Sequence, residues 1–224
     1  MNRQTWKGLT IWPATAILIA IAACPIAQSK ERNDANLTTA KVGALLAGRY
    51  DNSAQVIRGK AENPAPQHVI ISVESTQRAD WQIWRVHMDV DPEVAQAAGS
   101  DTSLDAVWAM NISRKAGDQS LELIPYSLTP SVDIASVKAS AFDEGQWIPL
   151  EACMLRGDFG ASRIVVQVPP DEMCVAVTMG LGGKRAFLPN SIERQGDWLH
   201  VQLMYFGKPW RVNAQRVPAG TSGI

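Results

Sequence analysis

The chain has little of what metal sites, catalytic sites and nucleic-acid interfaces are built from. Among 224 residues there are three cysteines and three histidines, and the formal net charge is only −1. His68, His87 and His200 stand far apart, and none has the spacing of a metal ligand pair. No glycine-rich phosphate loop follows a predicted strand, and no Gly-x-Ser-x-Gly elbow is present. These absences favour a protein that is not an enzyme and that binds neither metal nor nucleic acid.

The apolar run near the start of the chain is too short to span a membrane. Residues 9–23 are about 15 residues long, whereas a spanning helix needs about 20. Arg3 and Lys7 precede this run without an acidic residue, and a polar stretch follows it at residues 28–34. A basic start, a short apolar run and small residues are typical of a secretory signal. We therefore predict that residues 1–23 are a lipoprotein signal peptide.

The last four residues of this segment, Ile-Ala-Ala-Cys at 21–24, resemble a bacterial lipobox. In a lipobox an aliphatic residue and two small ones precede a cysteine that receives diacylglycerol. We expect lipidation at Cys24, because a cysteine seldom falls by chance at the exit of an apolar run. Several acyl chains on this cysteine would anchor the protein stably. The alternative is an ordinary signal that leaves Cys24 discarded or idle. Pro25 is not the aspartate of inner-membrane retention, which favours a periplasm-facing protein of the outer membrane.

Two cysteines remain besides Cys24, namely Cys153 and Cys174. In an oxidising periplasm the default for such a pair is a disulfide bond. In the chain-entropy model, a disulfide that closes a loop of this size stabilises the folded state by about 3 kcal/mol. The alternative is a pair of buried free thiols.

After a polar tether at residues 24–36, the chain is expected to form one domain over residues 37–224. Val42, Leu45, Leu46 and the pair at 49–50 follow a helical spacing, which predicts one N-terminal helix. A weaker helical pattern covers residues 92–98. Elsewhere, short stretches rich in β-formers alternate with turn signals. The predicted strands are residues 68–74, 81–88, 107–113, 121–128, 147–155, 163–168, 174–179, 184–188, 198–204 and 210–217.

About ten short strands at this spacing predict a mainly β, antiparallel fold, either a closed barrel or a sandwich. The order of several short motifs also resembles the CpcT/CpeT family of phycobiliprotein lyases, from about Leu45 to Val217. The motifs that carry the resemblance are the segment Leu45–Gln55, Asn63-Pro64, His68-Val69, Trp81-Gln-Ile-Trp84, Ile124-Pro-Tyr-Ser-Leu128, Cys153, Phe159-Gly160, Cys174 and Gly207-Lys-Pro-Trp210.

This resemblance implies a calyx-like (lipocalin-like) β-barrel of about ten strands that holds a linear tetrapyrrole in its mouth. Family members assist attachment of that tetrapyrrole to a cysteine. The chain departs from the family in two strands. Trp84-Arg-Val-His87 stands where the family has aromatic-x-Glu-Gln, and Trp-Ala-Met-Asn at 108–111 replaces Tyr-Arg-Gln-Arg. Arginine forks suit the propionates of a tetrapyrrole, so their loss predicts that the fold is kept better than the activity.

The residues that replace these arginines indicate a less polar interior. Trp108 and Met110 alternate on one face of their strand, and Trp81 and Ile83 do so on another. One interpretation is an apolar pocket with a few polar contacts, and the other is plain barrel core, the commoner role of aromatic stripes. The candidate ligand-binding residues are Arg85, His87, Trp108, Met110, Asn111 and Tyr126.

Three functions remain open from the sequence. The leading hypothesis is a lipid-anchored, non-catalytic protein that binds a small apolar or amphipathic molecule. The second is a chromophore lyase that assists attachment of a linear tetrapyrrole to a cysteine. The third is a structural or assembly lipoprotein of the envelope that displays a protein-binding surface. The membrane is an expected partner in each case, through the anchor at Cys24.

Overall fold

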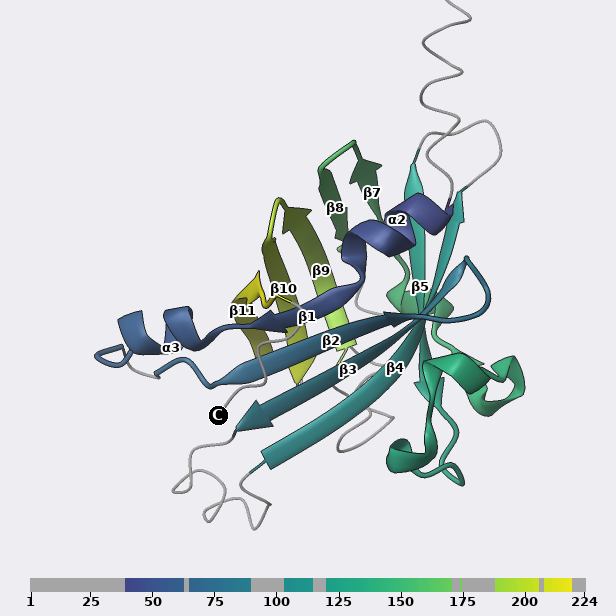
Figure 1. Cartoon of the computed structure of the whole chain (residues 1–224), viewed down its shortest axis with the longest axis horizontal. Helices are drawn as coiled ribbons and strands as arrows, with labels where there is room; N and C mark the ends of the chain where they lie inside the picture. Colours follow the sequence, from purple (N-terminus) through teal and green to yellow (C-terminus); the bar gives the residue numbers. More distant parts are fainter. Residues whose placement is uncertain are drawn as a thin grey trace, which may run out of the picture. The chain divides into compact units, whose positions relative to one another are not determined.

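The computed structural model describes residues 39–62, 65–89, 103–114, 120–170, 174, 188–205 and 208–218, with backbone alone for 204, 205 and 208 (Figure 1). Its α-helices are α2 (Thr39–Leu46) and α3 (Ser53–Arg58). The strands are β1 (Gly48–Asp51), β2 (Val69–Ser75), β3 (Trp81–Asp89), β4 (Ser103–Arg114), β5 (Leu121–Leu128), β6 (Trp147–Pro149), β7 (Leu155–Phe159), β8 (Arg163–Gln167), β9 (Leu188–Gln195), β10 (Trp198–Tyr205) and β11 (Lys208–Arg216). No described helix is long and apolar enough to cross a membrane.

Ten of these strands close into an antiparallel barrel. The order around the wall is β4-β3-β2-β1-β11-β10-β9-β8-β7-β5, and pairing of β4 with β5 closes the ring. The short strand β6 pairs with β5 on the same edge as β7, at the other end of β5. Closure leaves no long edge of unpaired backbone groups, which a sandwich would have to protect. The predicted mainly β barrel with a short N-terminal helix is therefore confirmed, and the sandwich alternative is excluded.

The strand register decides which side chains point inward. Trp84 lies opposite Trp108, and Val86 lies opposite Ala106, whereas Arg85 and His87 face Val107 and Asp105 on the other side of the sheet. Cross-strand partners share one face, and successive residues alternate between faces. The first set belongs to the main hydrophobic core, so this is the inner face. Trp84 and Trp108 stack there, with ring centroids 6.1 Å apart.

The N-terminal helix is shorter than its spacing predicts. It ends at Leu46, and the prediction that it continues through Arg49 and Tyr50 is wrong, because both belong to strand β1. Gly48 has a φ of 150°, a value that residues with a side chain rarely adopt, and the chain leaves the helix there. Tyr50 then pairs with Ile71 of β2 and Arg216 of β11, which are contacts remote in sequence.

The other predicted elements are mostly confirmed, with shifts at their ends. The predicted strand at 147–155 is divided by a short 3₁₀ helix, η4 (Glu151–Cys153), into β6 and β7. Strand β9 extends from Leu188 to Gln195, most of which the sequence pattern missed. The predicted helix at 92–98 and all but one residue of each of the predicted strands at 174–179 and 184–188 lie outside the described residues. So does the whole segment of the signal and lipobox, residues 1–36.

The disulfide prediction is confirmed. Cys153 and Cys174 are bonded, with their Cα atoms 4.7 Å apart, and both side chains are buried. The bond ties the short helix η4, at the start of β7, to a position 21 residues later in the chain. It therefore closes a loop next to the pairing of β7 with β5.

A long connection covers part of the outer face of the barrel. This segment, residues 129–146, joins β5 to β6 and contains the 3₁₀ helices η1 (Ile134–Ser136), η2 (Ala139–Ala141) and η3 (Glu144–Gln146). Its Val137, Ala139 and Phe142 pack with outward-facing Trp81 and Ile83 in a second, smaller hydrophobic cluster. The barrel wall between β3 and β5 is thus packed on both faces, and the 129–146 segment is anchored there.

Candidate functional site

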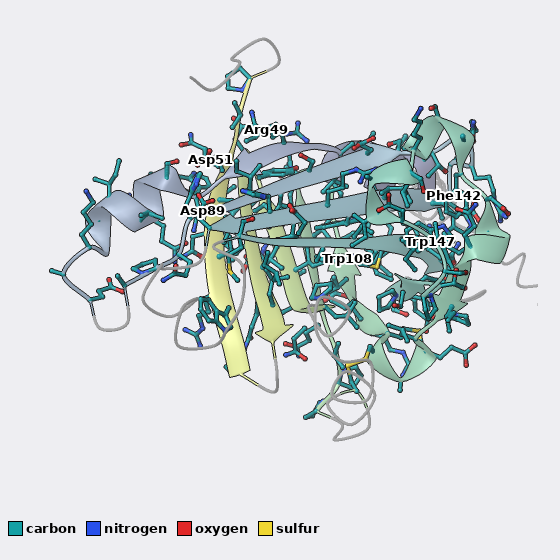
Figure 2. The ribbon with its side chains drawn as sticks, turned by 90° about the horizontal axis from the view of Figure 1, so that it is seen from below. Arg49, Asp51, Asp89, Trp108, Phe142 and Trp147 are labelled. Atoms are coloured by element: carbon teal, nitrogen blue, oxygen red, sulfur yellow. A yellow bond between two sulfur atoms is a disulfide. The ribbon has the colours of Figure 1, made fainter. Side chains whose placement is uncertain are left out.

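The six residues predicted as ligand contacts lie on opposite faces of the barrel wall. Trp108 and Met110 point inward and are 1% and 0% exposed, and they pack in the main core with Trp84. Arg85, His87, Asn111 and Tyr126 belong to the outer face by their register. Figure 2 shows Trp108 among the side chains within the barrel wall. The inner pair therefore has the packing of core side chains and cannot share one pocket with the outer four.

The outer four do not form one cluster either. Asn111 donates a hydrogen bond to the backbone of Asp80, 3.3 Å away, at the start of β3. Tyr126 packs against Trp81, with ring centroids 4.6 Å apart, in the outer hydrophobic cluster, and burial there raises the pKa of its hydroxyl. Arg85 and His87 lie on a different stretch of the wall. Of the six predicted residues, these two alone border the groove described next.

A groove of about 940 Å³ runs over the outer face of β2, β3 and β4, against the start of the 129–146 segment. Its volume is at the upper end of the range of small-molecule sites. The walls combine aliphatic side chains with a few charged ones. The lining residues are Arg49, Ile70, Ser72, Arg85, Val86, His87, Asp105, Ala106, Val107, Leu128, Val132, Asp133, Ile134 and Ala135.

Two arginines border the groove, and they differ in whether their guanidinium already has partners in the protein. The Arg85 guanidinium donates to the carbonyl of Val137 and lies 3.3 Å from a carboxylate oxygen of Glu74, so it fastens the 129–146 segment to β3. Arg49 is exposed, and within the described ranges its side chain makes no ion pair or hydrogen bond. The groove therefore carries one cation whose hydrogen-bond donors are available to a ligand.

The cation and the aliphatic residues of the groove come from different strands. Arg49 belongs to β1, and Figure 2 places it near Asp51 and Asp89. Aliphatic side chains of β2, β4 and η1 lie along the floor and side, namely Ile70, Val107 and Ile134. A molecule with an apolar body and one anionic group matches this combination of side chains.

Histidines and aspartates form a connected network beside Arg49. His68 Nδ1 lies 2.8 Å from Asp89 Oδ2, and His68 Nε2 lies 3.4 Å from Asp51. His87 Nε2 lies 3.2 Å from the other Asp89 oxygen, and His87 Nδ1 lies 2.8 Å from Asp105. Two histidines that are 19 positions apart in sequence thus share one carboxylate. The network joins β1, the residue just before β2, β3 and β4 across the outer face.

The network shifts the acidity of its members in the direction expected for ion pairs. Asp105, as hydrogen-bond acceptor, raises the pKa of His87 above its usual value, and Asp89 adds to the effect. The hydrogen bond from His68 lowers the pKa of Asp89. For Asp51, burial acts to raise the pKa, but hydrogen bonds from Ser53 and His68 outweigh it and the pKa is lowered. These groups therefore favour charged carboxylates facing a charged His87.

Part of this network has the atom order of a serine hydrolase triad. Ser53 Oγ lies 3.2 Å from His68 Nε2, and His68 Nδ1 contacts Asp89. However, the Ser53 hydroxyl donates its proton to Asp51, whose carboxylate would then lie beside any carbonyl under attack. A negative charge at that place opposes formation of an oxyanion. Within the described ranges, no group of three or more His, Cys, Asp or Glu side chains is arranged to hold a metal ion either.

The pairing of His87 with Asp105 makes a prediction about pH. Asp105→Asn removes the first partner of His87, so the midpoint of the His87 ring titration should fall, as followed by NMR. A raised pKa in the folded state stabilises the fold below the unfolded value of about 6.5, and this stabilisation is lost as the pH rises through the folded value. The advantage of wild type over Asp105→Asn in thermal unfolding should therefore be larger at pH 6 than at pH 8.5.

Asp133→Asn is the matched control for this experiment. Asp133 also borders the groove, but its carboxylate accepts a hydrogen bond from the backbone of Ala135 and belongs to the 129–146 segment. It should leave the His87 midpoint unchanged. An unchanged midpoint in Asp105→Asn would contradict the pairing seen in the structure.

A comparison with protein families found no family model that matches the chain, and a comparison with curated proteins found no significant match.

Proposed function

We propose that this protein is a binding protein for a small amphipathic molecule and holds it in the outer groove, with the anionic group of the ligand on Arg49. The observation that carries the proposal is a groove of about 940 Å³ with aliphatic walls and, on its β1 side, the available guanidinium of Arg49. Arginine offers a rigid fork of donors that suits a carboxylate or phosphate. The apolar body of the ligand would lie on Ile70, Val107 and Ile134.

The cellular setting belongs to the same proposal. We place the protein on the periplasmic side of the outer membrane, anchored by lipid on Cys24. What supports this is the signal-like N-terminus and the lipobox-like sequence before that cysteine. The Cys153–Cys174 disulfide is compatible with an oxidising compartment. An anchored protein with an open groove could receive or present a molecule that is poorly soluble in water.

The likeness to the CpcT/CpeT lyases remains a hypothesis about ancestry. What supports it is the ten-stranded closed barrel with a short N-terminal helix, which is the architecture that the resemblance implies. One fold hosts many activities, so the architecture carries no argument for lyase chemistry. The inner positions that differ from the family, Trp108 and Met110, are packed core. We therefore favour binding over attachment of a tetrapyrrole.

The proposal is tested with a dansyl-labelled undecanoic acid, a fluorescent probe that has an apolar chain and a carboxylate. Arg49→Gln should weaken its binding about fivefold, since a partly exposed ion pair contributes about 1 kcal/mol. Arg58→Gln is the control, because Arg58 is an exposed arginine of α3 that does not line the groove. It should leave the dissociation constant unchanged.

A second pair of variants tests the floor of the groove. Val107→Phe places a larger side chain among the aliphatic walls and should reduce probe binding more than Arg49→Gln does. Val165→Phe makes the same change on the outer face of β8, away from the groove, and should bind the probe like wild type. If Arg49→Gln and Val107→Phe both bind as wild type does, the groove is not the site.

A further inference from the structure

Arg194 points into the barrel, and both of its neighbours across the sheet are apolar. Arg194 of β9 lies opposite Ile164 of β8 and Leu199 of β10, and both of these are fully buried members of the main core. Since cross-strand partners share a face, Arg194 is on the inner face with them. Its side chain is itself only 6% exposed. Figure 1 shows β8, β9 and β10 side by side in this part of the wall.

Arg194 has no partner for its charge within the part of the chain that the structure describes. No ion pair or side-chain hydrogen bond involves its guanidinium there, and its Nε is buried without an acceptor. The buried polar side chains of the described residues are Asn52, Gln82, Ser127 and Arg194 itself, so none of them is a carboxylate. The charge of Arg194 is therefore left uncompensated among these residues.

Arg216 also faces inward, but the protein supplies hydrogen-bond acceptors for its guanidinium. Arg216 of β11 donates to the carbonyl of Leu45, 3.1 Å away, and to the hydroxyl of Tyr50, 3.2 Å away. It thereby caps the C-terminal end of α2, and Gly48 leaves the space that its guanidinium fills. By contrast, Arg163 lies outside the barrel, 2.9 Å from Glu193. The Nε of Arg216 is also buried without an acceptor, but its Nη2 is bonded, whereas no acceptor among the described residues contacts the guanidinium of Arg194.

An uncompensated guanidinium is costly at such a place. Arginine stays protonated at any physiological pH, so the side chain cannot avoid the cost by losing its proton. Burying an unpaired ion is unfavourable even after relaxation, and methionine would fill the same space without that penalty. The guanidinium therefore calls for an anion that the described residues do not supply.

We infer that Arg194 is the contact point of an anion-binding site inside the barrel, at the end covered by α2, and that it takes a carboxylate or a phosphate. The strand ends place it there: Arg194 is next to the β9–β10 turn, and the paired strands β10 and β11 bring Arg216 and α2 to the same end. The site is separate from the outer groove, which lies on the opposite face of the wall. This inference does not depend on the proposed function.

The test follows thermal unfolding of the protein in Tris chloride at constant ionic strength, with added phosphate, acetate or decanoate. Wild type should show a saturable rise in Tm with at least one of these anions, of about 5–10 °C at a hundred times its Kd. Response to phosphate alone assigns the site to a phosphate group. Response to acetate and decanoate assigns it to a carboxylate, and response to decanoate alone assigns it to the carboxylate of an amphipathic molecule.

Arg194→Met separates this site from a structural role of the arginine. The variant should lose the anion-dependent rise, and without added anion its Tm should equal or exceed that of wild type, because an unpaired charge has been removed. Arg163→Met removes an exposed, ion-paired arginine and should keep the full anion response. The inference is overturned if wild type responds to none of the anions, if Arg194→Met responds as wild type does, or if Arg194→Met melts several degrees lower in plain Tris chloride.

Discussion

Replacing Trp108 by alanine is expected to lower the free energy of unfolding by about 3–5 kcal/mol, measured by urea denaturation. The indole is 1% exposed, and its ring stacks on Trp84 inside the barrel. Removing it leaves a cavity among side chains that belong to different strands and cannot all move inward. The lost burial and the cavity both destabilise the fold, so the cost should be near the upper end for a single substitution.

Trp198→Ala is the matched control, because it removes the same atoms from the outer face. Trp198 is half-buried at the start of β10 and stacks on His200, with ring centroids 6.2 Å apart. Its loss should cost less than half as much as the loss of Trp108. The comparison also decides between the two interpretations that the sequence allowed for Trp108. If Trp108→Ala is as stable as wild type but loses a bound small molecule, the inner face is a ligand site and not core.

The sequence shows which residues of a strand share a face. It does not show which of the two faces points into the barrel. Trp108 and Met110 share one face, and Trp81 and Ile83 share another, as the pattern predicts. In most half-buried strands the apolar face is the inner one. Here the 129–146 segment covers the outside of β3, β4 and β5, so both faces are apolar. A strand buried on both sides carries no local signal of which face is inside.

The groove depends on contacts that are remote in sequence, which explains why Arg49 was missed. The helical spacing of Val42, Leu45 and Leu46 continues through Arg49, so the sequence pattern predicts that Arg49 belongs to the helix. In a helix Arg49 would not lie on the outer face of the sheet. The chain instead enters β1 at Gly48, because β2 and β11 pair with it there through backbone hydrogen bonds. Arg85 and His87 were identified from their position in a strand. The groove residues of the 129–146 segment belong to no sequence motif that could have identified them.

The histidine network shows the same limit in a shorter hairpin. His68 precedes β2 and His87 lies in β3, and both of their strands were predicted. Their meeting at Asp89 depends on the register of the β2–β3 pair, in which Ile70 lies opposite His87. A register that differed by one residue would turn His87 inward. Counting back from the turn at residues 76–80 would have brought the two histidines together.

Removing the Cys153–Cys174 bond is expected to lower the free energy of unfolding by about 3 kcal/mol, because the unfolded chain regains the freedom of the closed loop. The measurement compares urea midpoints of wild type and a Cys153→Ala, Cys174→Ala variant, each with and without dithiothreitol. The reductant should destabilise wild type toward the variant and leave the variant unchanged. Equal midpoints for the oxidised wild type and the variant would contradict the expectation.

The size of this effect matters for where the protein can fold. Domains are typically stable by about 5–15 kcal/mol, so the bond supplies a large share of the margin. It closes a loop that connects to β7, one of the strands that complete the ring with β5. A reduced chain would keep the barrel wall with a smaller margin and open it first near β7. Hydrogen exchange of β7 and β8 amides should therefore rise more on reduction than exchange of β2 and β3 amides, because the latter pair is hydrogen-bonded far from the bond.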